Sequence, residues 1–189
     1  MLAGHFGLAA AVKAKVPEVP LWALMLSTQL IDVIFVPLYL SDVETVVKTG
    51  EGYGNQIIHA DYSHSLLSVL VIAFLTGFLA RKLWGKRGGF TVGAVVFSHW
   101  LLDLLVHRPD LPILPGNLGH LPLLGLGIWR SSTLSMTAEL LLIAAGSFMY
   151  LRFAVSGTTG STRLLARCSG AILAVLMLLC LASDVLSTL

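Results

Sequence analysis

The sequence predicts an all-α integral membrane protein, a helical bundle of about five to six helices in which the first helix is short. Of the 189 residues, 56% are hydrophobic and 12% are charged, and the mean hydropathy is +0.86. Soluble domains carry about 25% charged residues, so this chain is too apolar for an ordinary soluble fold. We expect residues 1–189 to form a single transmembrane helical domain.

Six apolar segments carry this prediction, and most approach the roughly 20 residues that a bilayer-spanning helix needs. Their approximate ranges are 2–12, 20–40, 63–80, 89–106, 133–151 and 168–186. The first is short, so we expect it to lie within the protein or to cross only part of the bilayer. The turn at residues 17–20, Pro-Glu-Val-Pro, predicts that the first two segments form a helical hairpin.

The positions of lysine and arginine predict the orientation, because cytoplasmic loops are enriched in these residues. On one side fall Lys13, Lys15, Arg81, Lys82, Lys86, Arg87, Arg152, Arg163 and Arg167, and on the other Lys48, Arg108 and Arg130. We expect the first side to face the cytoplasm, with both termini and the loops 41–62 and 108–132 outside. The N-terminal positive charges follow the apolar run, whereas those of a secretory signal precede it, so we expect this segment to be mature structure.

Charge and cysteine content exclude other classes. The net charge is +2, and no basic tract is interleaved with aromatic residues, so nucleic acid is not an expected partner. Cys168 and Cys180 fall on one expected helix, twelve residues apart in the sequence. At about 18 Å they are beyond disulfide reach and do not indicate a redox compartment.

Ionisable residues inside the apolar segments are the main indication of function. They are His5, Asp32, His64, His99, Asp103 and Glu139. At 1.5 Å per residue from the inner turns, they stand roughly 15–25 Å into the membrane, in its outer half. An ionisable side chain at the centre of a membrane helix costs roughly 2.5–3.5 kcal/mol, so six at one depth need a common partner. We expect that partner to be a bound metal ion.

The residue types indicate which metal. His99 and Asp103 are four residues apart, share a helix face and could ligate one ion. Imidazole and carboxylate ligands suit zinc first, with manganese or iron as competitors. The predicted ligands are His5, Asp32, His64, His99 and Asp103. Alternatively, His99 and Asp103 form a hydrogen-bonded structural pair that holds helices together, Asp32 is a proton-relay carboxylate and His5 is a satisfied interior histidine.

Other polar residues are weaker candidates. His59, Asp61 and His107 lie near expected helix ends, where water can reach them, and suit a supporting, substrate-binding or solvated role. His120 is expected to be a loop histidine, and Asp184 an interfacial residue near the end of the last segment. The loop 108–132 is largely apolar, and we expect it to lie at the membrane interface with Trp129. It is either a substrate gate or a passive connector.

Four short motifs contain the predicted ligands: Gly-His-Phe at 4–6, Gln-Leu-Ile-Asp at 29–32, Tyr-Ser-His-Ser-Leu-Leu at 62–67 and Ser-His-Trp-Leu-Leu-Asp at 98–103. Together they resemble the motifs of the membrane-bound metal-dependent hydrolases of bacterial inner membranes. The resemblance extends to about Pro115. That family is distantly similar to zinc-dependent phospholipases C and related nucleases, all-helical enzymes that cleave phosphoesters. The resemblance implies the inner membrane as location.

The resemblance also implies a ligand arrangement. His5 and Asp103 would share one ion, and Asp103 would bridge to a second ion held with Asp32, His64 and His99. The soluble relatives add a His-x-x-x-Glu pair, but Ser135 precedes Glu139 at that spacing. One or two ions are therefore expected, not three.

These observations predict a membrane hydrolase in which a metal-activated water attacks a lipid or lipid-linked substrate. Asp32 or Glu139 is expected to act as base and to orient histidine ligands. The preference for a phosphoester rests on the resemblance. A metal-ion or proton-coupled transporter and a non-catalytic assembly protein are the alternatives, although the apolar inner halves of the segments favour a pocket that is open to one side only.

Overall fold

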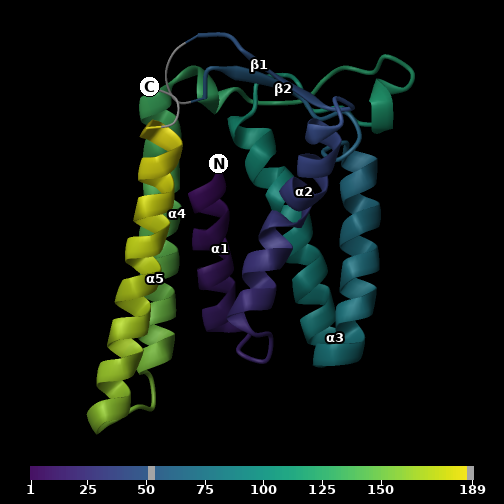
Figure 1. The fold of residues 1–189 in the computed structure, drawn as a ribbon. Helices are drawn as coiled ribbons and strands as arrows, with labels where there is room; N and C mark the ends of the chain where they lie inside the picture. Colours follow the sequence, from purple (N-terminus) through teal and green to yellow (C-terminus); the bar gives the residue numbers. More distant parts are fainter. Residues whose placement is uncertain (51–53, 187–189) are drawn as a thin grey trace.

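The computed structural model describes residues 1–50 and 54–186 and confirms the all-α class (Figure 1). Its helices are α1 (Leu2–Lys15), α2 (Leu21–Leu40), α3 (Leu66–Val106), α4 (Ser132–Val155) and α5 (Gly160–Leu186). Two short 3-10 turns cover Pro115–Asn117 and Ile128–Arg130. Helices α2, α3, α4 and α5 are long and apolar enough to cross a membrane. The chain is accordingly a membrane protein.

Helix α3 is a hairpin of two arms and contains two of the expected segments. It bends at Trp84 and Gly85, and Gly85 has a φ of 68°. Glycines let the two arms lie close together. A Cβ atom on Gly77 would lie 2.8 Å from the Gly89 carbonyl oxygen, and one on Gly93 would lie 2.9 Å from the Ala73 carbonyl oxygen. Small residues of this kind permit close helix packing within a membrane.

Helix α1 is short, as expected, and lies inside the bundle. Ala3, Ala9 and Ala10 are fully buried. The backbones of α1 and α4 meet closely, since a Cβ on Gly146 would lie 2.0 Å from the Gly7 carbonyl oxygen. Its 14 residues occupy the space between α2 and α4 (Figure 1).

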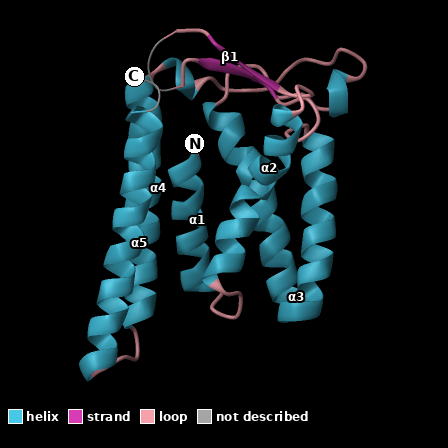
Figure 2. Ribbon diagram, in the orientation of Figure 1, coloured by secondary structure: helices cyan, strands magenta, loops and turns pink. Residues whose placement is uncertain are grey.

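A β-hairpin and the segment 107–131 cover one end of the bundle (Figures 1 and 2). Strands β1 (Thr45–Lys48) and β2 (Gln56–His59) are antiparallel, with Thr45 opposite His59. The sequence predicted only a loop over residues 41–62. Four residues are too few for a periodic pattern, but the adjacent β-branched residues Val46 and Val47, then Ile57 and Ile58, were a usable signal.

The opposite end carries the basic residues assigned above to the cytoplasmic side. They occupy the end of α1, the bend of α3 and the turn between α4 and α5. A hydrophobic cluster fills the interior near this end. Its buried members are Ala9, Val16, Val19, Ala23, Leu24, Ala80, Val92 and Val95.

Candidate metal centre

The five predicted ligands come from three helices and meet in the half of the bundle nearest the β-hairpin. His5 lies on α1, Asp32 on α2, and His99 and Asp103 on the second arm of α3. His64 directly precedes α3. All but Asp32 are at least 97% buried, and the side chain of Asp32 is 42% exposed.

The distances between their donor atoms match those between ligands of one cation. His64 Nε2 and His99 Nε2 lie 3.4 Å and 3.5 Å from Asp32 Oδ1. Asp103 Oδ2 lies 2.9 Å from His99 Nε2 and 3.7 Å from His64 Nε2. The other oxygen, Asp103 Oδ1, lies 3.6 Å from His5 Nε2. Because two tetrahedral ligands about 2.0–2.1 Å from zinc are about 3.3–3.4 Å apart, most of these separations suit a shared cation better than hydrogen bonds.

Two of the histidines are oriented by backbone carbonyl groups. The Nδ1 atom of His99 lies 2.7 Å from the Thr28 carbonyl oxygen, and that of His5 contacts the Met1 carbonyl oxygen. A neutral imidazole that donates from Nδ1 keeps its lone pair on Nε2, the atom that faces the carboxylates. The His5 Nε2 atom also lies 3.3 Å from the His99 carbonyl oxygen, at the long end of a hydrogen bond.

The third histidine is oriented through a serine and a buried carboxylate. The Ser63 hydroxyl lies 2.8 Å from His64 Nδ1 and donates to Glu44 Oε2 at 2.8 Å. Glu44 Oε1 also accepts hydrogen bonds from the backbone N–H groups of Tyr62 and Ser63, both at 2.8 Å. Since Ser63 uses its proton on Glu44, its oxygen accepts from His64 Nδ1 and leaves His64 Nε2 unprotonated. Glu44 precedes β1 outside the apolar segments, so nothing in the sequence marks it as part of the site.

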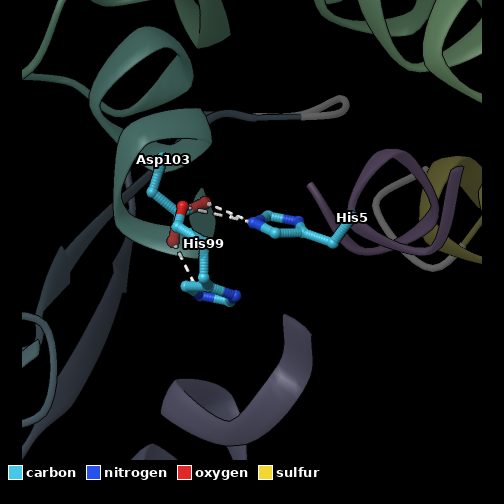
Figure 3. Close-up of side chains that lie close together, drawn as sticks. All are labelled: His5, His99 and Asp103. Atoms are coloured by element: carbon cyan, nitrogen blue, oxygen red, sulfur yellow. Dashed lines mark hydrogen bonds and ion pairs between the residues drawn. The ribbon is translucent and has the colours of Figure 1, made fainter. Parts of the chain in front are cut away.

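One buried atom tests whether these residues fit a metal. His99 Nε2 is buried and has no aligned hydrogen-bond partner among the described residues, although Asp103 Oδ2 lies 2.9 Å away. The carboxylate therefore lies beside the nitrogen (Figure 3). An imidazole nitrogen and a carboxylate oxygen side by side, both buried, are satisfied by a cation between them. The donor set fits zinc.

Two groups of three residues could each hold an ion, and they share His99. One is His5, His99 and Asp103, and the other is Asp32, His64 and His99. One nitrogen lone pair binds one ion, so both groups cannot be complete at once. Asp103 has one oxygen toward each group and is placed to bridge them. The described residues could therefore hold one ion with three ligands, and a second position would have fewer protein ligands.

His107 is buried, contrary to the expectation that water reaches it. The helix end is covered by the segment 107–131, and only 3% of His107 is exposed. Its Nδ1 atom lies 2.9 Å from Asp110 Oδ1, and Asp110 Oδ2 accepts a hydrogen bond from the Ile58 N–H at 3.1 Å. Trp129, expected at the membrane interface, is also buried, with its ring centroid 4.3 Å from that of His107.

Glu139 has a different place from the other predicted residues. It is fully buried, and its Oε2 atom accepts a hydrogen bond from the Gly4 N–H at 2.9 Å. Glu139 therefore holds the first turn of α1, next to His5, and belongs to neither of the two candidate ligand groups. This contact suits an anchor for a ligand-bearing helix. The proximity of Gly4 could not be foreseen from the sequence.

A cavity of about 260 Å³ opens onto the cluster. Of the predicted ligands, Asp32, His64 and Asp103 line it. Its other walls come from the β-hairpin, His107, Trp129 and the ends of α1 and α5, where Asp184 lies. Asp184, expected at the interface, thus borders the cavity. A substrate group in the cavity would be close to the carboxylates and to His64.

The remaining sequence candidates lie elsewhere in the covering layer. His59 is exposed on β2, and His120 is exposed in the loop with a φ of 49°. Asp61 is half-buried, and its backbone carbonyl accepts a hydrogen bond from Gly116. None of the three is among the grouped candidate ligands found in the described part of the chain.

Comparison of the chain with protein-family models, curated proteins and solved structures finds no match.

Proposed function

We propose that this chain is a membrane-embedded, metal-dependent hydrolase that acts on a lipid or lipid-linked phosphoester in the outer half of a bacterial inner membrane. The observation that carries the proposal is the orientation of three histidines. In His5, His64 and His99 a protein acceptor holds Nδ1, so that Nε2 faces carboxylates at distances typical of shared metal ligands. Such contacts fix the ring orientation and tautomer of metal-binding histidines in enzymes.

Zinc is the metal we expect. When bound, it lowers the pKa of a water molecule toward neutrality and polarises the scissile group. Hydrolysis forms a bond from the water oxygen to phosphorus and breaks the phosphorus–oxygen bond to the leaving alcohol. The proton that the water loses goes to a carboxylate, which passes it on to the oxygen of the leaving alcohol. Of the two expected bases, Asp32 borders the cavity, whereas Glu139 is buried against Gly4, so the role of base falls to Asp32.

The apolar interior on the cytoplasmic side favours hydrolysis over transport. An ion path needs polar groups that continue across the membrane. Between the cluster and the basic end, the hydrophobic core is made of alanine, valine and leucine, and the buried polar side chains of Ser27, Thr28 and Thr91 carry no charge. The cavity therefore suits a substrate that enters and leaves on one side. The phosphoester bond is proposed from the motif resemblance alone.

Metal analysis with an activity assay tests the proposal. The protein would be purified in detergent, its metals measured by mass spectrometry, and cleavage of phospholipids assayed before and after chelation. We expect stoichiometric zinc, loss of cleavage on chelation and recovery when zinc is restored. Protein that binds no transition metal would falsify the proposal. Stoichiometric metal without hydrolysis of any phosphoester, ester or amide lipid would instead indicate a structural site.

A further inference from the structure

A narrow apolar groove lies directly below the cavity, toward the basic end, on the same helices. It has a volume of about 180 Å³ and is lined by Phe6, Met25, Leu173, Leu176, Met177 and Cys180. Each helix contributes a cavity residue and, one or two turns lower, a groove residue. These pairs are Leu2 and Phe6 on α1, Asp32 and Met25 on α2, and Asp184 and Cys180 on α5. The groove therefore lies one to two helical turns below the cavity, on the same three helices.

The chemistry changes along this path from polar to apolar. The cavity is bordered by the carboxylates of Asp32, Asp103 and Asp184, whereas all six groove residues are apolar or weakly polar. Met177, 2% exposed, forms the floor, and Leu176, 57% exposed, stands at the edge. A lipid has the same succession, with a polar headgroup followed by a hydrocarbon chain.

The length of the groove matches part of a lipid chain. Leu173 and Cys180 are seven residues apart on α5, a rise of about 10 Å. One leaflet is half of a hydrocarbon core about 30 Å thick, or about 15 Å. A chain in the groove would thus be held over about two thirds of one leaflet, with its headgroup end toward the cavity.

We infer that the groove between α2 and α5 binds one acyl chain of a membrane lipid whose headgroup occupies the cavity. This inference rests on the proposed function and narrows the substrate to a lipid with an acyl chain. It assigns a specificity role to α5. The apolar side chains of the groove bind the chain by contact and by the exclusion of other lipids from the space, without a polar group of their own.

The first experiment blocks the groove. Leu176→Trp fills it from an exposed position, and Leu178→Trp is the matched control, because Leu178 is 46% exposed and points about 200° away around the same helix. Zinc content and substrate cleavage would be compared for a long-chain phospholipid and a dihexanoyl analogue. We expect Leu176→Trp to lower kcat/KM about tenfold for the long chain, equivalent to about 1.4 kcal/mol, with little change for the short one. Equal effects of the two variants on the long-chain substrate would contradict the inference that the groove binds an acyl chain.

The second experiment does not depend on catalysis. Zinc-loaded protein in nanodiscs of phosphatidylethanolamine and phosphatidylglycerol would be photolabelled with a phospholipid that carries a diazirine in mid-chain. We expect labelling of the peptide that contains Met177 and Cys180 to fall in Leu176→Trp and to persist in Leu178→Trp. Identical labelling in both variants would show that the groove does not bind the acyl chain, even if the protein hydrolyses lipids. If the labelling depends on the groove but the protein has neither zinc nor activity, the result would support acyl-chain binding in the groove and contradict the proposed hydrolase function.

Discussion

His99 Nε2 lies 2.9 Å from Asp103 Oδ2, one turn further along the same arm of α3, and both side chains are almost completely buried. Residues four apart on a helix share a face, so this pair is formed locally. The other Asp103 oxygen faces His5 from α1, and Oδ2 also faces His64. Asp103 is therefore the carboxylate that connects the three histidines, and a cation between these groups would compensate its buried charge.

Replacement of Asp103 by asparagine is expected to abolish tight zinc binding. Asparagine keeps the shape of the side chain but loses the negative charge and one oxygen ligand. Changes to groups that merely orient zinc ligands cost about 10–100-fold in affinity, so loss of a bridging ligand should exceed about a hundredfold. Competition with a fluorescent zinc chelator in detergent measures the affinity.

The control for Asp103→Asn is Asp61→Asn, which changes the same functional group in the half-buried covering layer. It should leave zinc affinity within about twofold, as expected of a residue away from the site. If Asp103→Asn binds zinc as tightly as Asp61→Asn does, Asp103 is a structural residue and the ligand assignment is wrong.

Ser63→Ala is expected to weaken zinc binding without disruption of the fold. The change removes the hydroxyl between His64 Nδ1 and Glu44 Oε2 and frees the imidazole to rotate or to change tautomer. We expect zinc affinity to fall about 10–100-fold, the usual effect of such an orienting group. Stability should fall by only about 1 kcal/mol, because Glu44 keeps its backbone hydrogen bonds.

Two further variants separate orientation from general damage. Ser63→Thr restores a hydroxyl and should recover most of the affinity, whereas Ser41→Ala removes an exposed hydroxyl that contacts only backbone carbonyls of its own helix. Ser41→Ala should bind zinc normally. Equal zinc affinities for Ser63→Ala and Ser41→Ala would show that Ser63 does not contribute to zinc binding.

Much of the fold was predictable because helices that face lipid are apolar on most of their surface. Phe74, Phe78 and Leu83 on α3, for example, are exposed and hydrophobic, so the segment is marked by composition alone. The β-hairpin lacks such a mark, since strands of four residues contribute little to any periodic signal. The position of the bend at Gly85 was predictable, because the charged residues around it separate two apolar segments.

The site was predictable where its residues lie inside apolar helices, and not elsewhere. A histidine or aspartate at the depth of His99 or Asp32 is conspicuous because burial of a charge in a membrane is costly. Glu44 and His107 lie outside the expected spans, where polar residues are ordinary, and only the covering layer buries them. Their roles depend on contacts between distant segments, which a single sequence does not reveal.

Gly7→Val is expected to destabilise the bundle, because α1 and α4 meet through their backbones. A Cβ atom at Gly7 would lie 2.5 Å from the Leu142 carbonyl oxygen, so the helices would have to separate. Overpacking of this kind costs about 1–3 kcal/mol. Thermal unfolding in detergent should show a lower midpoint for Gly7→Val than for Gly50→Ala, whose Cβ would meet nothing closer than 3.8 Å. Equal midpoints would mean that α1 is not packed against α4 as described.

Single cysteines at Thr49 and Lys86 are expected to react with membrane-impermeant maleimide from opposite sides of the membrane. Thr49 follows β1 in the covering layer, and Lys86 lies at the bend of α3, and both are exposed. The nine basic residues at this end of the bundle predict that Lys86 is cytoplasmic. In a background that carries Cys168→Ser and Cys180→Ser, intact spheroplasts should label Thr49→Cys, whereas Lys86→Cys should react only after permeabilisation. The reverse pattern would place the cavity on the cytoplasmic side and direct the search for a substrate to the inner leaflet.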